Sequence, residues 1–224
     1  MTILEAIKAR HAVRSYLDKE IPADERAALQ REIDACNRES GLHIQLVTGE
    51  PKAFDSRMAH YGKFSGVSSY IALVGKKSAE FDEKTGYYGE RVALAAQTLG
   101  LNTCWVAMTF SKGAAKKQIQ IGGGEALGCV ISLGFGATQG TAHKSKPMEA
   151  LCRADGGMPD WFRAGMEAAM LAPTAMNQQK FQLILTGEHT VSAKSLGGFY
   201  SKVDLGIVKY HFEIGAGPEN VRWA

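Results

Sequence analysis

Apolar residues recur with helical spacing at the start of the chain. Ile3, Leu4 and Ile7 share one face of such a helix. Thr2 and Glu5 have the form of a capping box, in which each side chain bonds the other residue's backbone amide. The pattern therefore predicts a helix that starts at Thr2.

Further along the chain, short apolar runs bounded by turn residues predict strands between amphipathic helices. The run from Leu127 to Leu133 is nearly all apolar, as expected of a central strand covered on both faces. Gly100 follows a helical pattern and is expected to form a left-handed cap. Strands are predicted over 44–47, 70–74, 103–107, 127–133 and 181–185, and helices over 23–38, 87–99, 161–171 and 202–214, the last ended by Gly215 and Gly217.

Composition and charge exclude several classes of protein. The 224 residues are 45% hydrophobic and 22% charged, with a net charge of +3 that is too small to indicate nucleic-acid binding. No apolar run approaches the roughly 20 residues of a membrane span, and the N-terminus resembles a helix rather than a signal peptide. The four cysteines form no C-x-x-C pair, and the six histidines show no metal-ligand spacing. We therefore expect a cytoplasmic protein without a metal site, with no nucleic-acid or membrane partner.

A polar loop between a helix and a strand is the first candidate site. Residues 172–179 read APTAMNQQ and precede the apolar run 181–185. Pro173 cannot continue a helix, so the chain must turn there. Short polar groups and backbone amides at the edge of a buried sheet are a common setting for a ligand.

Two basic pairs are candidates for binding a phosphate. Arg10 and Arg14 are four residues apart at the end of the first predicted helix, a spacing that puts both guanidinium groups on one helix face. Arginine binds phosphate through charge-assisted, often bidentate hydrogen bonds. Lys144 and Lys146 follow the apolar strand 127–133. Taken alone, each pair also fits an ordinary solvated surface.

Small residues occur where the chain after Gly100 becomes buried. Val106 and Ala107, followed by Met108, would let backbone amides approach a planar ring closely. A helix cap followed by a core strand explains the same apolar residues. The run 134–140 resembles a dinucleotide-binding turn, but its glycines depart from the G-x-G-x-x-G spacing, so we do not expect a Rossmann site.

Two distant stretches of the chain resemble each other. Residues 42–50 read LHIQLVTGE and residues 180–188 read KFQLILTGE, and both follow a helix and a polar loop. Chance similarity between helix-loop-strand segments would give the same pattern. A true repeat would divide the chain into two related halves, residues 1–150 and 151–224.

Taken together, four segments resemble the FMN-dependent nitroreductase family. Its R-x-S-x-R segment is similar to Arg10–Arg14, with Ala12 where serine is usual. Its A-P-S-x-x-N-x-Q-P loop is similar to Ala172–Lys180, where Thr174 replaces serine and Lys180 replaces proline. The other two are its E-x-L-G-L-G-T-C-W segment, similar to residues 98–105, and its K-S-R element, similar to residues 144–146.

The position of the loop departs from the usual family pattern. In most members it follows the N-terminal arginines closely, and the partner subunit of a dimer supplies part of each site. Here it lies in the second half, and the early equivalent, Asn37–Gly41, lacks the motif. The chain therefore resembles a subfamily of nitroreductases in which two halves of one chain imitate a dimer. The resemblance implies one intact flavin site per chain, between the halves, and a chain that could work as a monomer.

The resemblance further implies an α+β fold, with a central, mostly antiparallel sheet flanked by helices. Residues 1–150 would carry the FMN phosphate site, where arginines and lysines hold the phosphate and ribityl chain. Residues 151–224 would supply the loop that meets the flavin. The implied cofactor-binding residues are Arg10, His11, Ala12, Arg14, Val106, Ala107, Met108, Lys144, Lys146, Pro173, Thr174, Ala175, Met176, Asn177 and Gln179.

The implied activity is hydride transfer from NADH or NADPH, through FMN, to a small electron-poor acceptor such as a nitroaromatic, a quinone or a flavin. No catalytic side chain is expected, because the flavin carries the chemistry. Another flavin reaction on the same fold, such as reductive dehalogenation, is one alternative. A flavin- or nucleotide-binding protein without turnover is the second, and a structural relic that binds nothing is the third.

Overall fold

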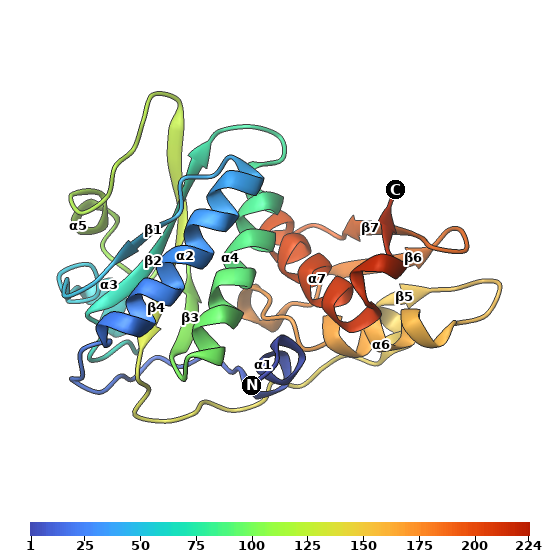
Figure 1. The fold of residues 1–224 in the computed structure, drawn as a ribbon, viewed down its shortest axis with the longest axis horizontal. Coiled ribbons are helices and arrows are strands. Elements are labelled where there is room, and N and C mark those ends of the chain that lie inside the picture. The colour runs from blue at the N-terminus through green and yellow to red at the C-terminus, as the bar shows by residue number, and fades with distance from the viewer. The chain divides into compact units, whose positions relative to one another are not determined.

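The computed structural model describes residues 1–224, and the chain divides into two compact units (Figure 1). The N-unit consists of residues 9–81 and 91–141. The C-unit consists of residues 1–8, 82–90 and 142–224. Each unit contains its own four-stranded sheet. The predicted α+β class with antiparallel pairing is confirmed, although two sheets are present where one was expected.

The sheet of the N-unit is antiparallel throughout, in the order β1-β2-β4-β3. Its strands are β1 (Gln45–Val47), β2 (Ser69–Lys76), β3 (Asn102–Val106) and β4 (Glu125–Gly134). As its apolar run predicts, β4 lies inside the sheet, paired on both sides. The helices of this unit are α2 (Ala23–Ser40), α3 (Arg57–Tyr61), α5 (Lys112–Lys116) and the last part of α4 (Phe81–Thr98).

The C-unit has a mixed sheet in the order β5-β6-β7-β8. The central pair β6–β7 is antiparallel, whereas β5 and β8 join it in parallel. Its strands are β5 (Cys152–Arg153), β6 (Phe181–Leu185), β7 (Thr190–Ser195) and β8 (Arg222–Trp223). Its helices are α1 (Ile3–Ala9), α6 (Asp160–Ala169) and α7 (Ser201–Ala216), with short 3-10 turns at Met148–Ala150, Ala175–Asn177 and Pro218–Asn220.

Short sequence motifs correctly predicted one helix start and one helix end. The capping box at the start of α1 is confirmed, since the Thr2 amide donates to Glu5 Oε2 at 2.7 Å and the Glu5 amide donates to Thr2 Oγ1 at 3.2 Å. Hydrogen bonds from the backbone amide and the side chain of Thr2 lower the pKa of the Glu5 carboxyl. At the end of α4, Gly100 has φ +77°, and the Leu101 amide donates back to the Ala96 carbonyl at 3.0 Å. The predicted left-handed cap is therefore present.

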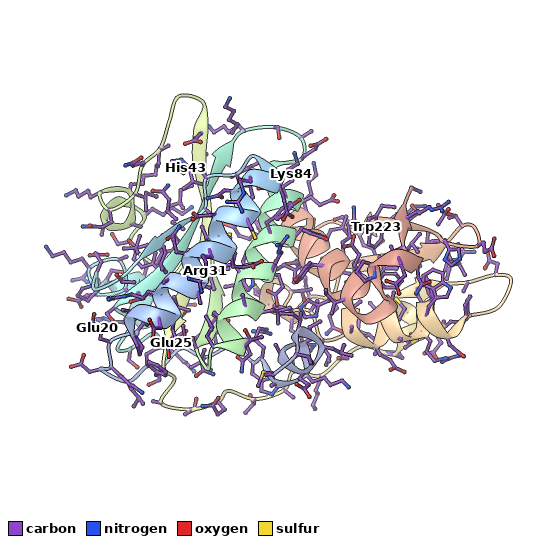
Figure 2. All side chains as sticks on the ribbon, viewed as in Figure 1. Glu20, Glu25, Arg31, His43, Lys84 and Trp223 are labelled. Atoms are coloured by element: carbon purple, nitrogen blue, oxygen red, sulfur yellow. The ribbon has the colours of Figure 1, made fainter.

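Aromatic side chains build the core of the C-unit. The rings of Phe162 on α6 and Phe212 on α7 lie 5.2 Å apart, centroid to centroid. Trp223, labelled in Figure 2, packs its ring 5.7 Å from that of Phe212. Its indole nitrogen donates to Glu213, and the Lys209 ammonium lies 4.6 Å from its ring centroid. The two-residue strand β8 is thus fixed to α7 by side chains as well as by its pairing with β7.

Two glycines let helices α4 and α7 approach within the C-unit. A Cβ atom on Gly86 would lie 1.9 Å from the Val203 carbonyl oxygen. A Cβ atom on Gly206 would lie 2.0 Å from the Glu83 carbonyl oxygen. The contact is reciprocal, because each glycine meets the carbonyl three residues before the other. Only glycine fits at either position.

A fully buried contact between a histidine and a carboxyl side chain connects the same two helices. His211 on α7 and Glu90 on α4 are both 0% exposed, and His211 Nε2 lies 2.9 Å from Glu90 Oε1. The other ring nitrogen, Nδ1, is 3.1 Å from the Ala168 carbonyl oxygen at the end of α6. Since that carbonyl can only accept, Nδ1 carries a proton. The pair therefore links three helices at one buried point.

Several predicted elements differ from the observed ones. Helix α4 begins at Phe81 instead of residue 87. Gly215 lies within α7, and Gly217 alone ends this helix. The C-unit includes residues 1–8, 82–90 and 142–150 as well as the C-terminal segment, and the division into halves at residue 150 stays a prediction. The short elements α5, β5, β7 and β8 were not predicted.

The proposed repeat is matched only in part. The segments 42–50 and 180–188 each contain a strand followed by an antiparallel partner, β1–β2 and β6–β7. However, β1 is an edge strand, whereas β6 has neighbours on both sides. The two-half arrangement therefore stays a prediction. No helix in the structure has the length and apolarity needed to cross a membrane.

Candidate functional site

The segment Arg10–Arg14 runs along strand β3 in the N-unit. Helix α1 ends at Ala9, and Ala12 then forms a parallel bridge with Thr103. The Val13 amide donates to the Thr103 carbonyl at 3.1 Å. The prediction that a helix places both arginines on one face is wrong. The helix ends before Arg10, so helical spacing does not relate the two side chains.

Both arginines lie close to the thiol of Cys104 on β3. Burial raises the pKa of this thiol, and the charges of Arg14 and Arg10 act against that rise. Arg10 is only 4% exposed, whereas Arg14 is exposed and its guanidinium lies 5.8 Å from the Phe64 ring centroid. Two guanidinium groups therefore share one neighbourhood, one below the surface and one at it.

The glycine-rich exit of β4 holds this segment from the other side. A Cβ atom on Gly136 would lie 2.7 Å from Asn102 Oδ1 and 2.9 Å from Val13 Cγ1. A Cβ atom on Gly140 would lie 2.8 Å from the Cβ of His11. These glycines allow close packing against the arginine segment.

The predicted ring-contacting residues lie at the end of the same strand. Val106 is the last residue of β3 and is buried. Ala107 and Met108 follow in a series of bends, and Met108 is 62% exposed. The N-unit thus contains seven of the predicted residues, in the segment bridged to β3 and at the end of β3: Arg10, His11, Ala12, Arg14, Val106, Ala107 and Met108.

The loop before β6 has an unusual backbone. Helix α6 ends at Ala169, two residues earlier than predicted, and Ala175–Asn177 forms one 3-10 turn. Met176, Asn177 and Gln179 have φ values of 52°, 54° and 46°. Non-glycine residues in this left-handed region cost about 1 kcal/mol or more each and cluster at ligand sites. Met176 is also 96% exposed, so burial of its side chain does not explain its conformation.

Gln179 joins this loop to the lysine segment. Its side chain, 4% exposed, donates from Nε2 to the Lys144 carbonyl at 2.9 Å and accepts from the Lys146 amide at 2.7 Å. Asn177 Nδ2 donates to the same Lys144 carbonyl at 2.9 Å, and the Gln179 amide donates to Thr174 Oγ1 at 3.1 Å. Two clusters that the sequence separates by about thirty residues are therefore one hydrogen-bonded unit.

The two lysines of this segment differ in their surroundings. The Lys146 ammonium donates to the Gln178 carbonyl at 2.9 Å and to the Gln179 carbonyl at 3.1 Å. These bonds give it a role in holding the loop. Lys144 contributes its carbonyl oxygen to the network, and its side chain is exposed. The C-unit thus gathers the remaining predicted residues: Lys144, Lys146, Pro173, Thr174, Ala175, Met176, Asn177 and Gln179.

Sequence reasoning missed Asp204 on α7, which anchors the loop. It is 4% exposed, and its two oxygens accept from the Ala175 amide at 2.8 Å and from Gln178 Nε2 at 2.6 Å. Burial raises the pKa of this carboxyl above its ordinary value of 3.8, against the opposing effect of both hydrogen bonds. The available signal was a lone acid within the apolar run 203–208, since a charge there needs buried donors.

Replacing Asp204 by asparagine should remove a pH-dependent part of the stability. Because the folded pKa is raised, the carboxyl contributes stability that is fully present below pH 3.8 and is lost as the pH rises through the folded pKa. The free energy of unfolding of the parent should therefore contain a term that falls with pH just above pH 3.8, and Asp204→Asn should lack it. Urea titrations across this range measure the term. An identical slope in both proteins would contradict the assignment, and Lys202→Gln at an exposed α7 position is the control.

A cavity of about 590 Å³ opens beside the loop within the C-unit. Its walls come from the loop, from the residue that precedes β6 and from the segment before α7. The lining residues are Ala175, Met176, Gln178, Lys180, Gly198 and Phe199. Gln178 and Lys180 were not among the predicted cofactor-binding residues, although the sequence places both beside Gln179.

Solved structures with a related fold come from nitroreductases. A putative nitroreductase from Thermotoga maritima superposes with a TM-score of 0.65 at 23% identity, covering 96% of this chain and 83% of that one. A putative nitroreductase from Desulfovibrio desulfuricans, solved in complex with FMN, has a TM-score of 0.55 at 16% identity and covers 71% and 99%. A putative NADH dehydrogenase/NAD(P)H nitroreductase from Parabacteroides distasonis has a TM-score of 0.54 at 20% identity and covers 69% and 98%.

The sequence itself matches one family over nearly its whole length. No curated protein matches the chain. The family model described as "Putative TM nitroreductase" matches residues 2–216, a range that includes the arginine segment, β3, the lysine segment and the strained loop. With a family model that spans this range and a fold shared with nitroreductase structures, the chain belongs to the TM nitroreductase family.

Proposed function

We propose that this protein is an FMN-dependent oxidoreductase that passes hydride from NADH or NADPH to a small electron-poor acceptor. The observation that carries the proposal is the pair Arg10 and Arg14, two cations held near one buried thiol on β3. Guanidinium pairs bind a phosphate monoester by charge-assisted hydrogen bonds. The FMN bound in the Desulfovibrio relative supports the choice of cofactor.

The other predicted residues offer the remaining kinds of contact that FMN needs. Thr174, Ala175 and Asn177 supply a hydroxyl, a small side chain and a carboxamide for the ribityl chain or the ring. The backbone of residues 106–108 supplies polar groups beside small side chains for the ring itself. Bound FMN would supply the hydride chemistry, so the chain needs no catalytic acid or base. Its residues bind and orient the cofactor and leave room for an acceptor.

A flavin-binding protein without turnover is the second candidate. The observation that favours it is the Lys146 ammonium, which donates to two loop carbonyls and so has fewer bonds left for a phosphate. Ala12 also lacks the hydroxyl that serine provides in the family pattern. Both features would weaken FMN binding or restrict it without abolishing the fold.

FMN affinity tests the proposal directly. The purified chain should be yellow, or become yellow with added FMN, and Arg10→Ala should weaken FMN binding by about tenfold or more, because a charge-assisted hydrogen bond is lost. Quenching of FMN fluorescence on binding measures the affinity. Arg14→Ala, at an exposed position, keeps the test valid if Arg10→Ala does not fold, and Arg31→Ala on α2 is the control (Figure 2).

The same titration extends to the loop and then to turnover. Asn177→Ala should also weaken FMN binding if its carboxamide contacts the cofactor. A colourless chain that takes up no FMN contradicts the flavin assignment altogether. Anaerobic addition of NADH or NADPH to the yellow protein separates the two candidates: an enzyme is bleached at a catalytically useful rate, whereas a binding protein stays yellow.

A further inference from the structure

The cavity beside the loop presents an apolar surface to solvent. Phe199 is 82% exposed and Met176 is 96% exposed, and both line the cavity. Exposed apolar side chains that line a concave site are available for contact with a bound ligand. At about 590 Å³, the cavity has the size of a small-molecule site.

Lys180 is the one charged residue among those that line the cavity. The lining otherwise consists of neutral side chains and a glycine. Lys180 is exposed, and its side chain forms no ion pair within the chain. Asp204 on α7 already uses both oxygens to accept hydrogen bonds from Ala175 and Gln178 of the loop. The free cation in the cavity therefore favours an anionic group on the ligand.

Hydrogen bonds within the chain hold the walls of the cavity in place without a ligand. Gln178 Nε2 donates to the Phe199 carbonyl at 2.9 Å and to Asp204 Oδ2 at 2.6 Å. This ties the loop wall to the segment that carries the aromatic ring. A Cβ atom on Gly198 would lie 2.6 Å from Gln178 Oε1 and 3.2 Å from Lys180 Cδ, so glycine keeps the interior open. A preorganised site loses less entropy when it binds a ligand.

We propose that this cavity binds the acceptor, and that the acceptor is a planar aromatic molecule with an anionic substituent such as a carboxylate. The aromatic ring packs on Phe199 and Met176, and the anion pairs with the Lys180 ammonium. Thioether and aromatic side chains both pack favourably on a planar ring. The identification of the ligand as an acceptor rests on the proposed function, whereas the binding itself does not.

Binding of two matched probes tests the site on the full chain. We expect 4-nitrobenzoate to bind about tenfold more tightly than its neutral counterpart 4-nitrobenzamide, because only the former pairs with Lys180. Lys180→Gln should remove this preference and leave the affinity for the amide unchanged. Phe199→Leu should weaken the binding of both probes. Ligand-observed NMR titration measures each affinity without NAD(P)H or turnover.

The controls are neighbouring residues outside the cavity. Lys194→Gln removes an exposed lysine from β7, and Leu196→Ala removes a side chain that is 55% exposed; neither should change the affinity for either probe. Equal binding of the two probes, or a preference that survives Lys180→Gln, overturns the proposal. So does a Phe199→Leu protein that changes its oligomeric state but binds both probes like the parent.

The outcome is distinguishable from failure of the proposed function. A chain that takes up no FMN but prefers 4-nitrobenzoate through Lys180 retains the site and loses the flavin assignment. A chain that binds FMN and is reduced by NADH or NADPH, but binds the probes without regard to Lys180 and Phe199, retains the flavin assignment and loses the site.

Discussion

Replacing Gly206 by alanine is expected to lower the free energy of unfolding by about 3 kcal/mol, at the upper end of the cost of overpacking. The new Cβ atom would lie 2.0 Å from the Glu83 carbonyl oxygen and 2.6 Å from the Tyr87 amide nitrogen. Both atoms belong to the backbone of α4, so no side-chain rotation relieves the clash. Gly86→Ala should have a similar effect, since its Cβ would meet the Val203 carbonyl at 1.9 Å. Urea denaturation followed by circular dichroism measures the loss.

Gly113 provides the matched control for both variants. It lies within helix α5, and a Cβ atom there would have no neighbour within 4 Å. Gly113→Ala should therefore stabilise the protein slightly, by about 0.5–1 kcal/mol, through the higher helix propensity of alanine. If Gly206→Ala and Gly113→Ala shift the transition in the same direction, the close approach of the two helices is refuted.

Removing Glu90 should have an effect as large or larger. Glu90→Ala deprives His211 Nε2 of its carboxylate partner at a position that is 0% exposed. Breaking a buried pair in this way costs about 3–5 kcal/mol, because an uncompensated polar or charged group stays in the interior. The midpoint of urea unfolding at neutral pH reports the loss.

Two further variants test whether the loss of stability comes from the buried polar contact. Glu83→Ala breaks the pair with Lys209, whose atoms lie 2.7 Å apart on a partly exposed surface, and should cost about 1 kcal/mol or less. The double replacement Glu90→Leu with His211→Phe removes both polar groups and should recover much of the stability. If the double variant is as unstable as Glu90→Ala, the loss of stability comes from altered packing and not from a buried histidine without its partner.

Elements with local signals were the ones the sequence predicted well. The capping box of α1, the Gly100 cap and β6 depend on residues close together in the chain, and each is present. The segment after α1 was wrongly predicted as helical because its conformation depends on bridges to Thr103 and Ser65, far away in sequence. The two-residue strands β5 and β8 exist only through their pairing partners, so no local pattern marks them.

In the candidate site, too, residues marked by local motifs were predicted, whereas contacts between residues distant in sequence were not. Residue types marked the arginine segment and the loop as candidates, and both lie within the residues 2–216 that the family model matches. The pairing of Gln179 with the lysine segment and of Asp204 with Gln178 joins residues more than twenty positions apart, which a single sequence does not reveal. The role of the Lys146 ammonium within the loop was missed for the same reason. Motifs indicate which residues matter, whereas their partners emerge only from the fold.

The reciprocal contact of Gly86 and Gly206 has a consequence for how the protein responds to dilution. Both helices belong to one chain, so their association is intramolecular and its equilibrium does not depend on protein concentration. The same crossing between two separate chains would weaken on dilution by mass action. A covalent connection replaces that dependence with a fixed effective concentration. The two helices therefore stay packed at concentrations at which a noncovalent pair of subunits would separate.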